Sequence, residues 1–122
     1  MHIKKLMKQN IIKEKSFMFA VRIVNLCKIL KQRNEFVLSR QLLRSATSVG
    51  ANTREALNAE SKKDFIHKLQ IAQKEADESI YWLELLHATE YLNDKEFSSL
   101  NNDAVELSKI LKSIILSTKN NS

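Results

Sequence analysis

Two histidines follow a carboxylate at a spacing of three residues, in Asp64-x-x-His67 and Glu84-x-x-His87. Glu-x-x-His is the ligand pattern of di-iron sites in some four-helix bundles, where each of two facing helices supplies one copy. Here both copies fall in one predicted helix, about 30 Å apart along its axis and about 200° apart around it. Because one site cannot use both, the sequence predicts surface or interface histidines, no metal site and no cofactor.

Other patterns that mark catalytic centres are missing from the sequence. The chain has one glycine, so it holds no glycine-rich phosphate loop, and its one cysteine, Cys27, stands in an apolar stretch where a reduced core thiol is expected. The carboxylates within residues 64–90 are typical of a solvated helix face or of partners for lysine and arginine. We therefore expect no catalytic residues, no enzyme activity and no small-molecule substrate.

The basic residues are better organised. Six of them form two rows on the first two predicted helices: Lys15, Arg22 and Arg33, and then Arg40, Arg44 and Arg54. At 100° per residue the second row falls within about 40° of one line, opposite the apolar seam of its helix. Such rows are typical of a helical surface that holds a nucleic-acid backbone by its phosphates, so we predict these six residues as nucleic-acid-binding.

The charge distribution leaves a second interpretation open. The net charge is +6, but residues 1–61 hold 12 Lys and Arg against 4 Asp and Glu, whereas residues 62–122 hold 8 against 10. This asymmetry indicates either a polyanion partner or complementary halves that meet in an oligomer, where the arginines would pair with carboxylates across a subunit boundary. No aromatic platform lies among the basic rows, so base stacking is not expected.

Four helical segments must position these residues. One glycine and no proline in 122 residues disfavour β-folds, and the apolar spacing predicts helices over residues 16–32, 35–59, 61–91 and 93–118. We expect N-terminal caps at Asn34, Ser61 and Asn93. Short loops then predict an all-α, antiparallel up-down four-helix bundle in a single domain, residues 1–122, with a flexible basic arm over residues 1–12 and a frayed tail over residues 119–122.

The apolar stripes predict a hydrophobic core and, in addition, apolar surface that this core does not use. Core seams at spacings of three and four run through residues 42–56, 65–83 and 97–114. Residues 17–30 carry two adjoining apolar arcs, more than a four-helix core needs, which indicates a subunit interface. Gly50 stands in a run of small residues, where we expect it to make room for a close approach. Polar residues interrupt the longest apolar run, so we expect no membrane span and a cytoplasmic protein.

Two long, ordered motifs carry a family resemblance. The first is Gln41-Leu42-Leu43-Arg44-Ser45-Ala46-Thr47-Ser48-Val49-Gly50-Ala51-Asn52, and the second is Ser61-Lys62-Lys63-Asp64-Phe65-Ile66-His67-Lys68-Leu69, followed by Tyr81-Trp82-Leu83-Glu84-Leu85-Leu86. Over about residues 10–116 the chain resembles the four-helix bundle proteins encoded in intervening sequences of 23S ribosomal RNA genes, also called S23-type proteins.

This resemblance implies a ring-like homopentamer. The family is similar to the accessory variability determinant protein of diversity-generating retroelements, a basic pentameric barrel that binds nucleic acid; Arg40 and Arg44 match its basic pattern, and Arg22 and Arg54 match it less closely. By this analogy we expect a non-enzymatic oligomeric scaffold that binds structured RNA or an RNA–protein complex through backbone contacts. The alternative is a protein-interaction scaffold whose charged faces serve its own assembly, without nucleic acid.

Overall fold

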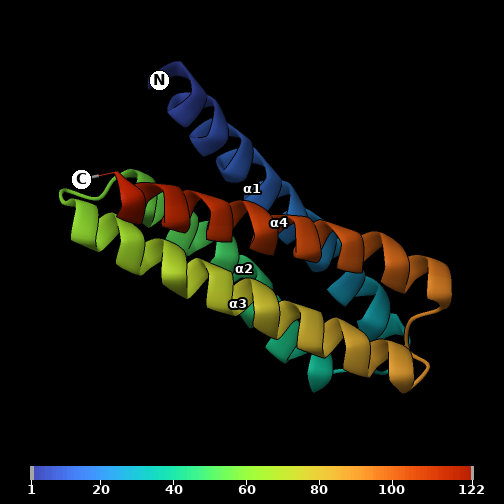
Figure 1. The fold of residues 1–122 in the computed structure, drawn as a ribbon. Coiled ribbons are helices and arrows are strands. Elements are labelled where there is room, and N and C mark those ends of the chain that lie inside the picture. Colours follow the sequence, from blue (N-terminus) through green and yellow to red (C-terminus); the bar gives the residue numbers. More distant parts are fainter. Residues whose placement is uncertain (1, 122) are drawn as a thin grey trace.

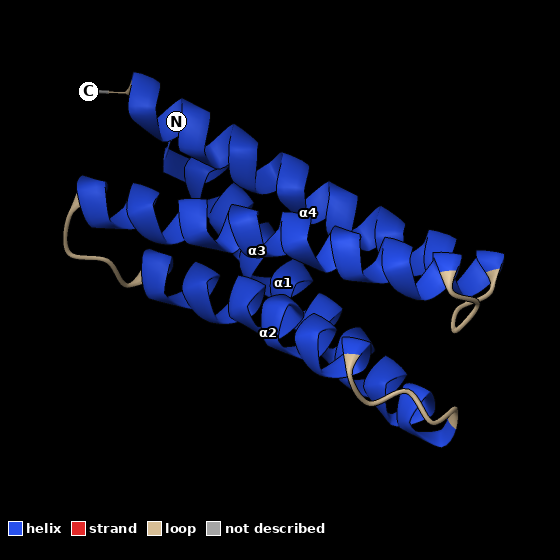
Figure 2. Cartoon of the chain, turned by 90° about the horizontal axis from the view of Figure 1, so that it is seen from below, coloured by secondary structure: helices blue, strands red, loops and turns tan. Residues whose placement is uncertain are grey.

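The computed structural model describes residues 2–121 and consists of four helices, which confirms the predicted all-helical fold. They are α1 (His2–Gln32), α2 (Leu38–Leu57), α3 (Lys62–Ala88) and α4 (Asp94–Asn120). No strand occurs between residues 2 and 121. Each helix packs against two others, α1 on α2, α2 on α3, α3 on α4 and α4 on α1 (Figure 1). The connecting loops lie at the two ends of the bundle, so that its long faces are formed by helices alone (Figure 2).

Helix α1 begins much earlier than residue 16, where the apolar spacing placed its start. Residues 2–15 contain neither glycine nor proline, so nothing in them interrupts a helix. The first of these turns rise away from the other three helices (Figure 1). The expected basic arm, residues 1–12, therefore falls on helical turns from residue 2 onward, and its flexibility stays a prediction. Met1 and Ser122 lie outside the described residues, and Lys119 and Asn120 of the expected frayed tail belong to α4.

The predicted apolar seams form the core. All five seam positions of α2 are buried: Leu42, Ala46, Val49, Thr53 and Ala56. On α1 the buried arc is the one that contains Phe19, Ile23 and Leu30, whereas the adjoining arc leaves Phe17 and Val24 exposed. A fully buried leucine or phenylalanine contributes about 1.5–3 kcal/mol, so these seams supply most of the driving force for packing. The surplus predicted for α1 is thus real, and it lies on the surface of the single chain.

Two of the three predicted caps are confirmed. Asn93 opens a full capping box with Glu96, because each side chain accepts the backbone N–H of the other residue, and the Ser61 hydroxyl accepts the N–H of Asp64 at 3.0 Å. The expectation at Asn34 is wrong. Asn34 has a φ of 62° and ends α1 in the left-handed region, a conformation that asparagine tolerates better than most residues.

Glu35 takes the capping role instead. Its carboxylate accepts the N–H groups of Val37, Leu38 and Ser39 at 3.2, 2.9 and 2.7 Å, and the residue is 5% exposed. Burial on its own would raise the pKa of Glu35, but the backbone hydrogen bonds outweigh it and hold the pKa below its ordinary value of 4.5. The start of α2 is therefore held by an ionised carboxylate that serves three orphan donors.

We expect Glu35→Gln to destabilise the fold by about 1 kcal/mol at pH 7, because a neutral amide is a weaker acceptor for three N–H groups. The folded pKa is lowered, so the parent's extra stability is full above about pH 4.5 and is lost as the pH falls through the lower folded pKa. Urea unfolding at pH 7 and at pH 3 measures both effects. Glu60→Gln, an exposed control, should leave stability unchanged; an equal loss in both variants would contradict the capping role.

Candidate nucleic-acid interface

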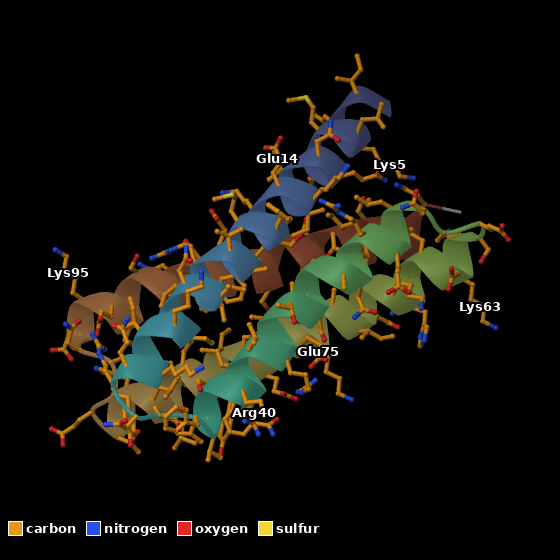
Figure 3. The ribbon with its side chains drawn as sticks, turned by 180° about the vertical axis from the view of Figure 1, so that it is seen from behind. Lys5, Glu14, Arg40, Lys63, Glu75 and Lys95 are labelled. Atoms are coloured by element: carbon orange, nitrogen blue, oxygen red, sulfur yellow. The ribbon has the colours of Figure 1, made fainter. Side chains whose placement is uncertain are left out.

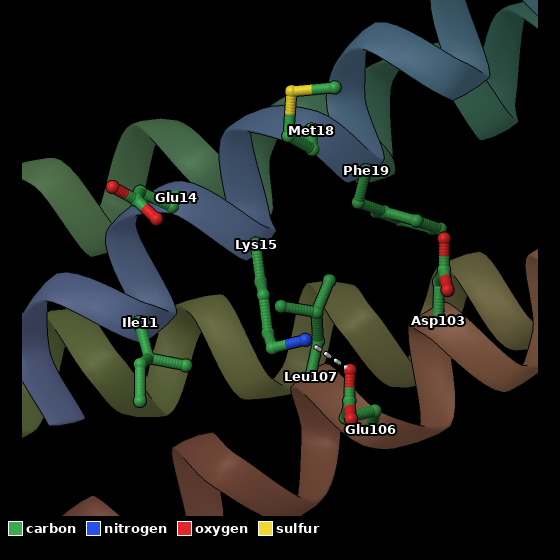
Figure 4. Close-up of a pocket in the computed structure, with 8 residues that line it drawn as sticks. All are labelled: Ile11, Glu14, Lys15, Met18, Phe19, Asp103, Glu106 and Leu107. Atoms are coloured by element: carbon green, nitrogen blue, oxygen red, sulfur yellow. Dashed lines mark hydrogen bonds and ion pairs between the residues drawn. The ribbon is translucent and has the colours of Figure 1, made fainter.

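The predicted row on α1 faces carboxylates of α4 in the same chain. Lys15 Nζ lies 2.9 Å from Glu106 Oε1, an ion pair that Figure 4 shows beside the hollow between the two helices. Arg22 Nη1 lies 2.5 Å from Asp103 Oδ2. As residue numbers rise along α1, those of its partners fall along α4. The hydrogen bond with Glu106 raises the pKa of Lys15 above its ordinary value.

Arg33, the last member of this row, directly follows α1 and contacts both the first turn of α4 and the connection that precedes it. Its guanidinium contacts both carboxylate oxygens of Glu96, at 3.1 and 2.9 Å, and donates to the carbonyl oxygen of Tyr91 at 2.7 Å. The hydrogen bond from Arg33 and the one from the Asn93 backbone hold the pKa of Glu96 below its ordinary value. One carboxylate thus completes a helix cap and binds a neighbouring helix.

The three members of the predicted row on α2 differ in whether they pair with a carboxylate. Arg44 pairs with Glu75 of α3, with 3.0 Å between Nη1 and Oε2, and its other terminal nitrogen contacts Glu78. The Trp82 indole N–H also donates to Glu78, at 3.0 Å. The pairing of arginine with carboxylates that the charge distribution left open therefore occurs within one chain. Exposed pairs of this kind contribute at most about 1 kcal/mol each.

Arg40 and Arg54 are different, because neither forms an ion pair with any residue between 2 and 121. Arg40 is exposed at the start of α2 (Figure 3). Arg54 lies one turn before the end of α2, and its guanidinium carbon is 5.6 Å from the ring centroid of Phe17 on α1. Of the six predicted residues, the structure leaves these two cations without a carboxylate partner.

Phe17, Arg54 and Lys13 lie together in a shallow groove between α1 and α2, which we name the α1–α2 groove. One hollow of it, about 210 Å³, is lined by Lys13, Ser16, Phe17, Ala20, Thr47, Gly50, Ala51 and Arg54. The adjoining hollow adds Asn10 and Glu14. The Phe17 side chain is 53% exposed, so an aromatic surface does accompany the cations, contrary to the expectation from the sequence. The position of Phe17 in the surplus apolar arc was the one sequence signal that it is exposed. Residue spacing alone could not predict that this arc lies beside Arg54 of α2.

The close approach at Gly50 is made by the backbone of α1. A Cβ added at Gly50 would lie 3.5 Å from the carbonyl oxygen of Ser16, an ordinary van der Waals distance. Glycine is therefore not needed to make room there, although the helices do pass close to each other at this point. A small residue is enough to let the groove form.

His67, His87 and Cys27 have separate surroundings. His87 Nε2 is 2.7 Å from Asp94 Oδ1, and its ring stacks on Phe97, whereas His67 is exposed on α3. Burial, and to a lesser degree Glu35, raises the pKa of Cys27 to about 11, so the thiol is protonated at neutral pH. Within residues 2–121 no three His, Cys, Asp or Glu side chains gather as metal ligands would. None of the helices described has the length and apolar character of a membrane span.

Comparisons with known proteins give one family. The model of the 23S rRNA-intervening sequence proteins matches residues 8–113. The chain is also similar to the crystal structure of a protein of unknown function from the S23 ribosomal protein family of Bacteroides thetaiotaomicron. Identity is 57%, the TM-score is 0.88, and the match covers 89% of this chain and 98% of the other. A search among curated proteins found no match.

We expect Gly50→Ala to stabilise the fold by about 1 kcal/mol, because alanine is the better helix former and the added methyl meets only an ordinary contact. Thermal unfolding followed by circular dichroism measures the change. Gly50→Leu is the matched comparison, since its larger side chain must displace α1 and should lower the melting temperature. A loss of stability in the alanine variant would show that the two helices need glycine at this contact.

Proposed function

The chain belongs to the family of 23S rRNA-intervening sequence proteins, and from this premise we propose that it is a non-enzymatic scaffold that binds nucleic acid, with structured RNA as the favoured ligand. The bundle is up-down and antiparallel, and five copies assemble into a homopentamer in the cytoplasm. The falling order of α4 partners along α1 supports the antiparallel arrangement. Exposed apolar side chains of α1 that do not line the α1–α2 groove, Met18, Val24 and Ile29, support an assembly of several copies.

The α1–α2 groove carries the nucleic-acid proposal. Lys13 and Arg54 supply two cations for backbone phosphates, and the half-exposed ring of Phe17 gives an unpaired base an apolar surface. Glu14 lines the same hollow, so the charged residues of the site, Lys13, Arg54 and Glu14, give it a net charge of +1. Phosphate contacts position a nucleic acid without reading its sequence, so binding is backbone-led and tolerant of sequence.

Among the six basic residues predicted from the sequence, the proposal assigns nucleic-acid contact to Arg40 and Arg54. The other four already face carboxylates, and a phosphate would have to compete with those groups. Their charges serve the packing of α1 on α4 and of α2 on α3. This division follows from the ion pairs and not from the position of the residues along the helices.

The second candidate is a protein-interaction scaffold that binds no nucleic acid. The first turns of α1 favour it, because they leave Ile3, Leu6 and Met7 exposed. Large apolar groups on a projecting helix are typical of contacts between proteins. Under this alternative the intrachain ion pairs serve the fold alone, and RNA would be ignored at physiological salt.

The double variant Arg54→Gln/Phe17→Leu tests the proposal. We expect it to weaken binding of a fluorescent structured RNA by at least about fivefold, because base–aromatic stacking is worth about 1–3 kcal/mol and one phosphate contact is lost. Fluorescence anisotropy between 50 and 200 mM salt measures affinity and salt slope. Lys28→Gln/Val24→Leu is the matched control, with the same change in charge elsewhere on α1.

An unchanged affinity in the groove variant, or an equal loss in the control, would contradict binding in the α1–α2 groove. A parent protein that ignores RNA even at 50 mM salt would favour the protein-interaction scaffold. Size-exclusion chromatography with light scattering on all three proteins checks that assembly is unaltered. A parent particle of one chain would contradict the homopentamer.

A further inference from the structure

A second group of cations lies at the end of the bundle where α2 meets α3. We name it the basic end and define it by Lys5 of α1, Lys62 and Lys63 of α3, and Lys119 of α4. These residues come from three helices and from distant parts of the sequence. Figure 3 shows Lys5 and Lys63 toward this end and Lys95 toward the other. The two basic rows predicted from the sequence include none of these lysines.

The basic end is hollowed. An open depression of about 800 Å³ is lined by Lys62, Lys63, Ile66, His67, Gln70 and Lys119. Three lysines, a histidine and a glutamine therefore contribute to its lining, which includes no aspartate or glutamate. Ile66 adds an apolar side chain to this lining, and the three lysines give it a net positive charge.

The lysines of the depression are not neutralised by ion pairs within residues 2–121. Lys63 and Lys119 have no carboxylate within 4 Å, and Lys62 contacts only the backbone oxygen of Asn121. This differs from the rows on α1 and α2, where carboxylates face four of six cations. Asp64 follows Lys63 in the first turn of α3, but it does not line the depression.

The depression continues toward the α1–α2 groove. A neighbouring hollow of about 340 Å³ shares Lys62 with it and is lined also by Lys5, Gln9 and Glu60. Gln9 adjoins Asn10 on α1, which lines the groove. Lys5 and Lys13 are eight residues apart, about 12 Å along α1, a separation that spans about two phosphates of a nucleic-acid strand. An extended polyanion fits this track better than a single small anion.

We propose that the basic end binds backbone phosphates of the same nucleic acid that occupies the α1–α2 groove; this inference rests on the proposed function. Lys62, Lys63 and Lys119 act as point charges on successive phosphates, and Gln70 and His67 donate hydrogen bonds to phosphate oxygens. The depression holds no aromatic side chain, so it contributes affinity without base recognition. The ligand class is a nucleic-acid strand and not a free phosphate ion.

The triple variant Lys62→Gln/Lys63→Gln/Lys119→Gln tests this assignment on the full chain. We expect RNA affinity to fall on the order of tenfold at 150 mM salt, and the slope of log K against log salt to shrink by about 2–3, because three phosphate contacts are lost. The triple variant Lys28→Gln/Lys31→Gln/Lys95→Gln removes the same charge from the opposite end and should change affinity less than about threefold. Arginine at positions 62, 63 and 119 should preserve binding.

Each other outcome overturns the assignment. Equal losses in both glutamine variants would show that RNA follows the net charge, which leaves the groove proposal intact. Failure of the parent to bind RNA at 50 mM salt would remove the proposed function and this inference together. Tight binding of tripolyphosphate that the basic-end variant loses, with RNA binding unchanged, would identify a small phosphorylated ligand. A change of particle size in the basic-end variant alone would show instead that the lysines bind carboxylates of another copy.

Discussion

The burial of Phe19, Ile23 and Leu30 fixes the rotation of α1 about its own axis, and the other features of the surface depend on that rotation. At 100° per residue, it turns Lys15 and Arg22 toward α4 and leaves Phe17 on the side of α2. A rotation by one residue would break the ion pairs with α4 and remove the aromatic surface from the groove. The apolar contacts therefore decide which cations are neutralised, although the cations contribute little to stability themselves.

The carboxylates of the molecule are used unevenly as a consequence. Glu96 of α4 pairs with Arg33 and completes a capping box, and Glu75 of α3 pairs with Arg44. No carboxylate, by contrast, lines the depression that contains Lys62 and Lys119. A chain with a modest net charge can in this way present a strongly positive region. The distribution of pairs, more than the total of +6, determines where a polyanion would settle.

The sequence predicted the helices and the core better than the partners of charged residues. The seam from Leu42 to Ala56 and the cap at Asn93 depend on local spacing, which a sequence displays directly. The early start of α1 was missed because, between residues 3 and 15, only Ile12 is buried in the core. Asn34 was misplaced because it ends α1 with a positive φ, while the Glu35 carboxylate accepts the first N–H groups of α2. The partners of Arg44 and Arg54 depend on how each helix is rotated relative to its neighbours. Residue spacing within one helix does not determine that rotation.

The projecting turns of α1 have a thermodynamic consequence. Ile12 is their first buried side chain, and before it the helix is held by little beyond its own hydrogen bonds and the contact of Lys8 with Ser113. Segments of this length sit near the midpoint of the helix–coil equilibrium when they lack tertiary packing. Their amides should exchange with solvent through local opening, far faster than those of the core. A partner that covered this segment would gain part of its specificity by stabilising a helix that the rest of the chain supports only weakly.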